Sequence, residues 1–354
     1  MLNLLKEVVE RKGSDLHIAP GSPPRIRVVG ELIPLNEYGV LTPTDTKNLI
    51  YSVLTDAQKK RLEEEFEIDF SFEMKDVARF RGNAYFQRQS LAAVFRLVPF
   101  EIPDFDTLGL PSIIKSFAHK DRGLVLVTGP TGSGKSTTLA SLIKIINETY
   151  PYHVITIEDP IEFIYKHNRS LISQRELGSD TKSFARALRA ALREDPDVIL
   201  VGEMRDPETI EAALTAAETG HLVFSTLHTN STIETINRIV DVFPAEKQAQ
   251  IRTQLSFVLV GAVAQKLIKR KDGRGRVAAT EVFIPTPAIR NLIRENKLHQ
   301  IYSMMQTGQA ATGMITMNQS LAKLVTEGII DTEEAKKISP DTKELETLIK
   351  AYTS

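Results

Sequence analysis

Apolar and polar positions along the first hundred residues predict a sheet covered by helices. Apolar side chains recur at helical spacing over residues 2–11, and a second helix is expected over 44–66 after the TPTD capping signal at 42–45. Short alternating runs predict strands in SDLHIAP, PRIRVVGELIPL, IDFSFEM, ARFRGNAYFQRQ and LAAVFRLVP. We therefore assign residues 1–102 to an N-terminal α+β domain and residues 103–121, which mix turn residues with one helical stretch, to a linker.

From residue 122 the pattern changes to buried strands that alternate with amphipathic helices. Apolar runs predict strands at 124–127, 153–163, 198–201 and 221–231, and helical spacing predicts helices between them. This alternation is typical of a doubly wound parallel sheet, so residues 122–354 are assigned to a second, α/β domain. Further along, we expect one long helix over 246–267, a strand over 277–284 and helical segments after Pro285.

A glycine-rich turn stands between the first of these strands and the helix after it. Glycine lets backbone N–H groups converge on a phosphate, and the helix N-terminus adds the positive end of its dipole. In the spacing GxxxxGKS, the lysine can reach the β- and γ-phosphates and the serine hydroxyl can ligate Mg²⁺. The sequence therefore predicts a site for ATP with Mg²⁺ built from Gly129, Pro130, Thr131, Gly132, Ser133, Gly134, Lys135, Ser136 and Thr137.

Acidic residues leave the carboxyl ends of two predicted strands. Glu158, Asp159 and Glu162 follow one strand, and Glu203 follows another. Ligands bind at this edge of an open parallel sheet, so Glu158 and Glu203 are candidates to face Mg²⁺ with Ser136, and Glu203 is a candidate to polarise the attacking water. A solvated turn at Pro160 and a helix cap before Pro207 are the alternatives.

Two histidines stand on either side of the apolar run at 222–227 within HLVFSTLHTNS. No third ligand accompanies His221 and His228, so we do not expect them to bind a metal. His228, at the carboxyl end of the strand, is a candidate to bond a phosphate. For His221, a satisfied core histidine remains the alternative.

Arginines are frequent on the N-terminal strands. Arg79, Arg81, Arg88 and Arg96 lie in segments otherwise suited to burial. Arginines on an exposed face are the simplest explanation. The predicted phosphate loop offers a second explanation for these arginines. An arginine supplied by a neighbouring subunit can stabilise the charge that builds on the γ-phosphate.

Composition narrows the classes of function. The chain of 354 residues has a net charge of −1, which argues against nucleic acid as a partner, and it contains no cysteine for disulfides or thiolate metal sites. Because the net charge is close to zero, we interpret two basic stretches as solvated surfaces. They are the stripe of Arg186, Arg189 and Arg193 and the segment KLIKRKDGRGR. No apolar run approaches the ~20 residues that span a bilayer, and the first residues lack a signal-peptide core, so a cytoplasmic location is expected.

Four blocks in one order resemble a known superfamily. GPTGSGKS, TIEDPIEF, DPDVILVGEMRD and GHLVFSTLHTNS are similar to the Walker A, Asp box, Walker B and His box of the secretion ATPases, the hexameric motors of type II and type IV secretion and of type IV pili. AIRNLIRE, the short N-terminal half opening with GSDLHI and the lack of cysteine resemble its pilus retraction branch. The resemblance implies a PAS-like domain, a RecA-like ATPase domain and a homohexamer.

The resemblance also implies roles for single residues. Glu203 would be the catalytic glutamate, and Glu158, Asp159, Glu162, His221 and His228 would line the site. Arg81 and Arg96 are candidates to enter a neighbour's nucleotide site, and Arg290, Arg294 and Glu295 of AIRNLIRE are candidates to couple the motor to its partner.

The implied function is ATP-driven withdrawal of pilin through an inner-membrane platform protein, with the motor peripheral at the inner face of the cytoplasmic membrane. Pilus extension and type II secretion ATPases, the alternative, usually carry a longer N-terminal region and a four-cysteine zinc element. This sequence shows neither, so no zinc is expected. A RecA-like translocase on nucleic acid and a module that binds ATP without turnover are the remaining alternatives.

Overall fold

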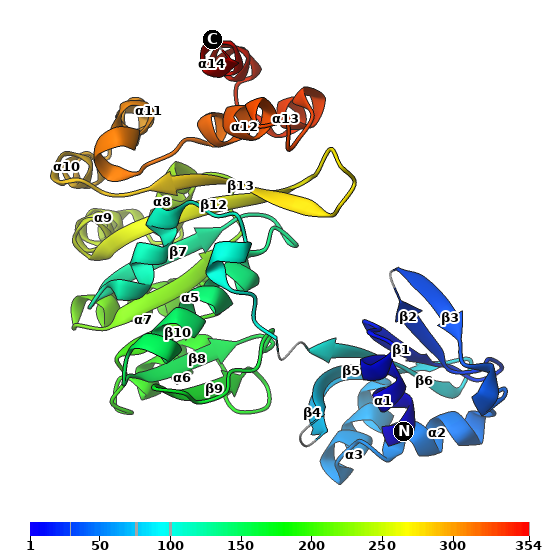
Figure 1. Cartoon of the computed structure of the whole chain (residues 1–354). Helices are drawn as coiled ribbons and strands as arrows, with labels where there is room; N and C mark the ends of the chain where they lie inside the picture. The colour runs from blue at the N-terminus through cyan, green and yellow to red at the C-terminus, as the bar shows by residue number, and fades with distance from the viewer. Residues whose placement is uncertain (29, 75–76, 99–100, 354) are drawn as a thin grey trace. The chain divides into compact units, whose positions relative to one another are not determined.

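The chain divides into two compact units. A computed structural model describes residues 1–28, 30–74, 77–98 and 101–353 (Figure 1). The first unit comprises Met1–Glu101 with Glu162–Ile164, and the second comprises Ile102–Ile161 with Tyr165–Ser354. Val29 and Pro99, which belong to two of the predicted strands, lie outside the described residues.

The first unit is an antiparallel sheet with helices packed on it. Its strands run in the order β3-β2-β1-β6-β5-β4. Helix α1 (Leu2–Glu10) presents Leu4, Leu5 and Val8 to a core shared with strand residues such as Phe80 and Phe95. The predicted α+β class is therefore confirmed. The strands are β1 (Asp15–Ile18), β2 (Arg25–Val28), β3 (Glu31–Pro34), β4 (Glu67–Met74), β5 (Ala78–Gln87) and β6 (Ser90–Val98).

The single helix expected over residues 44–66 is wrong, because two helices occupy this stretch. Helix α2 (Pro43–Tyr51) ends at Ser52, and α3 (Asp56–Glu65) begins after Thr55. The Thr55 side chain accepts a hydrogen bond from Gln58 N, and the Gln58 side chain accepts one from Thr55 N. This second capping box starts a new helix, which the helical spacing alone did not reveal.

The second unit contains a sheet of mixed direction with helices on both faces (Figure 1). Its strand order is β13-β12-β7-β11-β10-β8-β9, and only the β12–β13 pair is antiparallel. Successive residues of β7 face opposite sides: Leu124 and Leu126 join one apolar cluster, and Val125 and Val127 join another. The strands are β7 (Gly123–Thr128), β8 (His153–Glu158), β9 (Leu171–Glu176), β10 (Val198–Val201), β11 (Leu222–Leu227), β12 (Leu259–Lys269) and β13 (Arg276–Phe283).

Helices from different parts of the sequence cover the two faces. Helix α5 (Lys135–Thr149) packs with Val125 and Val127, whereas α6 (Phe184–Ala191), α7 (Pro207–Glu218), α8 (Thr232–Asp241) and α9 (Ala245–Val258) pack with Leu124 and Leu126. The predicted α/β class with a parallel-containing sheet is confirmed. Strand β13 is the antiparallel member of this sheet.

Two segments of the sheet differ from the predicted elements. The long helix expected over residues 246–267 is wrong, because α9 ends at Val258 and the chain continues as β12, parallel to β7. Its apolar run fits a buried helix or a buried strand equally well, and pairing with β7 decides between them. Strand β9 was not predicted, since LISQRE mixes apolar and polar residues without a strict alternation.

Residues 103–121, expected as a linker, pack into the second unit. They form η2 (Phe105–Thr107), α4 (Ser112–Lys115) and η3 (Ser116–His119). Phe105, Ile114 and Phe117 are buried in the cluster that contains Val125 and Val127. This stretch therefore contributes to the core that supports β7.

The chain after Pro285 is helical, as predicted, through α10 (Pro287–Arg294), η4 (Leu298–Gln300), α11 (Ile301–Thr312), α12 (Met317–Thr326), α13 (Thr332–Ile338) and α14 (Thr342–Thr353). Helices α12 and α14 share an apolar cluster with β12 and β13 through Leu321, Leu345 and Ile268. None of the helices in the described part of the chain combines the length and the apolar character needed to cross a bilayer.

Candidate functional site

The loop between β7 and α5 has the backbone that its glycines predict. Gly134 caps α5 with φ of 91°, and Gly129 has φ of 140°. A Cβ at Gly129 would lie 2.3 Å from the carbonyl oxygen of Gln265 and 2.7 Å from Ser133 Oγ. Any side chain there would therefore displace the loop, which explains why glycine occupies this position.

Lys135 is folded over this loop. Its Nζ donates hydrogen bonds to the carbonyl oxygens of Gly129, at 2.8 Å, and Pro130, at 3.1 Å. Burial lowers the pKa of the Lys135 ammonium, and the carboxylate of Glu203 acts in the opposite direction. The charge is thus held at the centre of the loop, where an anion would meet it.

Ser133 supplies an unsatisfied polar atom in the same loop. Its Oγ is buried and has no hydrogen-bond partner among the described residues. Buried hydroxyls in folded proteins are normally paired. The orphaned hydroxyl and the glycine-lined turn fit a bound phosphate group, and Thr131 and Ser136 are exposed beside them.

A residue that the sequence did not single out holds the loop in place. Gln265 of β12 donates from Nε2 to the carbonyl oxygen of Ser133, at 2.8 Å, and accepts at Oε1 from Thr138 Oγ1, at 2.9 Å. Its side chain is buried. The helical spacing predicts a helix over this residue, so the sequence does not place it beside the loop. A polar residue within the apolar run of β12 was the one available signal.

The parallel strands bring the predicted carboxylates to the edge where β7 ends. Val201 of β10 pairs with Ile157 of β8 and with Ser225 of β11, so the residues that follow these strands lie at one edge. Glu158 is buried there and accepts a hydrogen bond from Thr156 Oγ1 at 2.6 Å. Asp159 follows it and is exposed.

Glu203 is the centre of a small charged group at this edge. Its Oε1 lies 2.7 Å from Arg205 Nε and 3.2 Å from His228 Nε2. Burial acts to raise the pKa of Glu203, but the hydrogen bonds and charges of Arg205 and His228 outweigh it, and the pKa lies below its ordinary value. Glu203 is therefore ionised at neutral pH. Arg205 was not among the predicted site residues.

His221 does not join this group, and its place in the nucleotide site stays a prediction. It precedes β11, whereas His228 follows that strand, and a strand of this length separates its ends by about 20 Å. The Nδ1 of His221 lies 2.9 Å from the carbonyl oxygen of Ala216, in the last turns of α7. Within one chain this contact fixes His221 against the end of α7.

Glu162 and the two candidate arginines belong to the first unit. Arg81 Nη1 lies 3.3 Å from Glu162 Oε1, so these two residues form an ion pair within the first unit. Arg96 Nε lies 2.8 Å from Oδ1 of the buried Asp15. Arg81 and Arg96 are directly opposed on β5 and β6, so both project from one face of the sheet.

The residues of AIRNLIRE have different surroundings on and after α10. Ile289 and Ile293 are buried, as their spacing predicted. The Arg290 guanidinium donates to the carbonyl oxygens of Ser256, of Phe257 at 3.1 Å and of Leu259 at 2.9 Å, which closes the C-terminal end of α9.

Glu295 is exposed, whereas Arg294 is half-buried, as Arg290 is. The Arg294 guanidinium bonds Asn291 and lies 5.4 Å from the ring centre of Phe257, which is 63% exposed. Glu295 is exposed and pairs with Lys297 at 2.7 Å. We call the exposed Phe257 and Glu295, with the half-buried Arg294 beside Phe257, the accessible surface.

The fold and the loop together define a P-loop nucleotide-binding protein. Residues 2–337 match the family described as "Type II/IV secretion system protein". This chain belongs to that family, and the predicted resemblance to the secretion ATPases is confirmed.

Two relatives show which members of the family this chain is similar to. The chain is 55% identical over 314 residues to a "Twitching motility protein" of Neisseria gonorrhoeae, covering 89% of this chain and 83% of the relative. It is 52% identical over 337 residues to the "Type IV pilus retractation ATPase PilT" of Pseudomonas aeruginosa, covering 94% of this chain and 96% of the relative.

A solved structure agrees with these relatives. The crystal structure of the pilus retraction motor PilT with bound ADP superposes with a TM-score of 0.92 at 56% identity, covering 98% of this chain and 99% of the other. The predicted fold, with its RecA-like and N-terminal domains, is therefore that of a solved pilus motor.

No group of three or more potential ligands for a metal ion, from His, Cys, Asp and Glu, occurs in the described ranges.

Proposed function

We propose that this protein is the motor ATPase that retracts type IV pili, working as a homohexamer at the inner face of the cytoplasmic membrane. The main support is near-full-length similarity to a protein named as a pilus retraction ATPase, together with an intact phosphate loop facing an ionised Glu203. The names of the relatives reported above do not favour the alternative of pilus extension or type II secretion.

The loop residues bind the triphosphate of ATP. Backbone N–H groups from Gly129 to Ser136 converge on the phosphates, and Lys135 leaves its carbonyl partners to reach the β- and γ-phosphates. The exposed hydroxyl of Ser136 and the carboxylates of Glu158 and Glu203 are positioned to hold Mg²⁺. A bound Mg²⁺ would neutralise charge on the phosphates.

Glu203 positions the attacking water. Phosphoryl transfer asks the protein mainly to orient the nucleophile and to neutralise charge. An ionised carboxylate at the edge where β7 ends can accept a hydrogen bond from a water in line with the γ-phosphate. His228, bonded to the same carboxylate, is placed to sense the γ-phosphate, and Asp159 lines the approach.

Arg81 and Arg96 complete a neighbour's site in the ring. They oppose each other on one face of a sheet, each paired with a carboxylate, Glu162 or Asp15. Their guanidinium groups can meet the γ-phosphate of an adjacent subunit. Hydrolysis then depends on subunit contact. ATP, ADP and empty sites favour different arrangements of the two units, and their cycle generates movement.

Force passes to an inner-membrane platform protein and withdraws pilin from the base of the fibre. The accessible surface of Arg294, Glu295 and Phe257 is the contact that we assign to this partner. Arg290 holds Phe257 in place by donating hydrogen bonds to the carbonyl oxygens of Phe257 and Leu259.

Deletion of the gene, scored for pilus number and surface motility, tests the proposal. Loss of retraction leaves cells that carry pili but do not move, and restoring the gene returns movement. Cells without pili would contradict retraction and favour an extension role. Stimulation of hydrolysis by DNA at low salt would instead favour a nucleic-acid translocase.

A further inference from the structure

A basic cavity lies in the second unit, at the edge strand β9. It encloses about 560 Å³ between β9, the loop after it and α6. In the strand order, β11, β10 and β8 stand between β7 and β9. At ~4.8 Å per step, the strand that leads into the phosphate loop and the strand that lines the cavity are about 19 Å apart. Nothing in the proposed hydrolysis uses it. Its size is that of a small-ligand site. The lining residues are Arg175, Asp180, Thr181, Lys182, Arg186, Arg189, Ala190 and Arg193.

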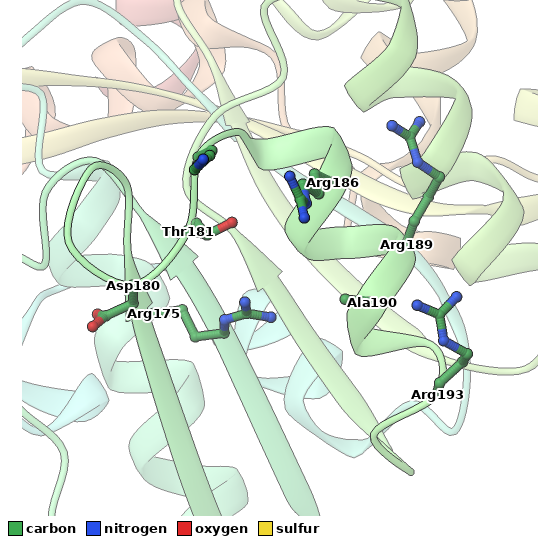
Figure 2. Close-up of a pocket in the computed structure, with 8 residues that line it drawn as sticks. Arg175, Asp180, Thr181, Arg186, Arg189, Ala190 and Arg193 are labelled. Atoms are coloured by element: carbon green, nitrogen blue, oxygen red, sulfur yellow. The ribbon is translucent and has the colours of Figure 1, made fainter.

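The basic stripe in the sequence forms one wall of this cavity. Arg186 and Arg189 lie on α6 and Arg193 lies just beyond its end, at spacings of three and four that align them on one side. Figure 2 shows these side chains on one side and Arg175, from β9, on the other. The stripe is therefore part of a concave site and not merely a flat solvated face.

The charges in and around the cavity do not balance. Five cationic side chains line it, against one carboxylate, Asp180. Two more carboxylates stand beside it, since Glu194 pairs with Arg175 at 3.3 Å and Glu208 with Arg189 at 3.7 Å. About two positive charges remain uncompensated, on a chain whose net charge is −1.

The uncompensated cations are free to bind a ligand. Among the residues that the structure describes, Lys182, Arg186 and Arg193 have no ion pair, and all three are exposed. Asp180 does not offset them, because its carboxylate accepts a hydrogen bond from Glu176 N at 2.8 Å and points away from the arginines (Figure 2).

We propose that this cavity binds a phosphate-bearing anion of about two negative charges, at a site separate from the ATP site. Guanidinium groups present planar forks that match phosphate oxygens, and the arginines approach from opposite walls, so one anion can bridge them. A bound anion that contacts both walls would link α6 to β9. Across this cavity, β9 is otherwise linked to the residues after α6 by the ion pair of Arg175 with Glu194.

Inorganic pyrophosphate is the probe that tests the site. Because the phosphate loop also binds it, titration calorimetry is done on the Lys135→Ala protein, without Mg²⁺ and at low salt. We expect one remaining binding site per chain. Arg186→Ser or Arg189→Ser, combined with Lys135→Ala, should weaken it about tenfold, as loss of one charge-assisted contact predicts.

Arg274→Ser is the matched control. Arg274 is an exposed arginine of the basic hairpin turn, so its loss removes the same charge outside the cavity and should leave the affinity unchanged. Thermal melts check that each variant is folded. In an otherwise wild-type chain, Arg189→Ser should keep ATP binding, so failure of this site and failure of the ATP site can be told apart.

Vesicles identify the source of the anion. Capture of the Lys135→Ala protein on phosphatidic acid vesicles, reversed by pyrophosphate and absent with phosphatidylcholine, would assign the site to a lipid phosphate. Pyrophosphate binding without capture would assign it to a soluble phosphate.

Three results would overturn the proposal. These are no pyrophosphate binding at low salt, equal weakening by Arg274→Ser and Arg189→Ser, or binding of polyglutamate without pyrophosphate. The last result would indicate a surface for an acidic polypeptide.

Discussion

Oε1 of Glu203 lies 3.2 Å from Nε2 of His228, although the two residues belong to different sequence blocks. Glu203 follows β10 and His228 follows β11, and these strands are parallel neighbours. Parallel pairing brings both ends to one edge, beside the loop that follows β7. One residue from the Walker B block and one from the His box therefore form a single charged contact.

The pH dependence of hydrolysis should move when the partners of Glu203 are removed. Arg205 and His228 hold the pKa of Glu203 below its ordinary value, so Arg205→Met should raise that pKa and shift the acid limb of the pH–rate profile to higher pH. His228→Asn should shift it in the same direction. Steady-state phosphate release from about pH 5 to 8 measures this, and an unchanged acid limb in both variants would count against Glu203 as the base.

The same pair of contacts predicts a stability effect with a defined sign. Since the folded-state pKa of Glu203 is depressed, its ionised form stabilises the fold above the ordinary carboxyl pKa, and this contribution is lost as pH falls through the folded value. Glu203→Gln should therefore flatten the pH dependence of the free energy of unfolding below about pH 5.

The Glu203→Gln variant should also keep ATP binding while abolishing turnover. Near-normal hydrolysis by this variant would remove Glu203 from catalysis.

Gln265 should control the shape of the phosphate loop. Gln265→Leu removes its hydrogen bonds with Ser133 and Thr138 and should cost about 1–3 kcal/mol of stability, with a loss of ADP affinity on the order of tenfold. Gln265→Glu keeps an acceptor for Thr138 but loses the donor to Ser133, so it separates the two contacts. ADP titration and urea unfolding measure the two effects. Unchanged ADP affinity in both variants would show that the loop holds its shape without Gln265.

Arg290 and Arg294 should behave differently although they share one helix. Arg290→Ala leaves backbone carbonyls of α9 and β12 unbonded and should lower the free energy of unfolding by about 1–3 kcal/mol. Arg294→Ala should change stability by less than about 0.5 kcal/mol and keep ATP hydrolysis, but stop twitching. Urea unfolding, phosphate release and a motility assay separate these outcomes. Loss of hydrolysis in the Arg294 variant would assign it a structural role.

Arg96 should act across a subunit interface. Arg96→Ala is expected to lower hydrolysis with little change in nucleotide affinity, and mixing it with Lys135→Ala protein should restore part of the activity through mixed interfaces. Because Arg96 also pairs with the buried Asp15, Arg96→Ala with Asp15→Asn is the control for an uncompensated carboxylate. The absence of rescue at every mixing ratio would contradict a role in trans.

Local sequence was enough to predict elements whose signals are local. The spacing from Gly129 to Ser136 defines a phosphate loop wherever it occurs between a strand and a helix, because the glycines and the lysine act within one turn. The strands that carry Glu158 and Glu203 were also predictable, since a short apolar run ending in an acid is a local pattern. The sequence by itself thus determined the nucleotide loop, the α/β class and the family resemblance.

Pairing between distant segments decided the rest. Pairing with β7 and β13 makes residues 259–269 a strand, and that strand brings Gln265 to the loop. Likewise, two histidines of one sequence block lie at opposite ends of β11, so His228 contacts Glu203 whereas His221 contacts the backbone of Ala216 in α7. The arginines of α6 become a site only when β9, a strand that the pattern did not reveal, supplies the facing wall. Tertiary structure decided these features because strand order and burial depend on contacts that no local pattern encodes.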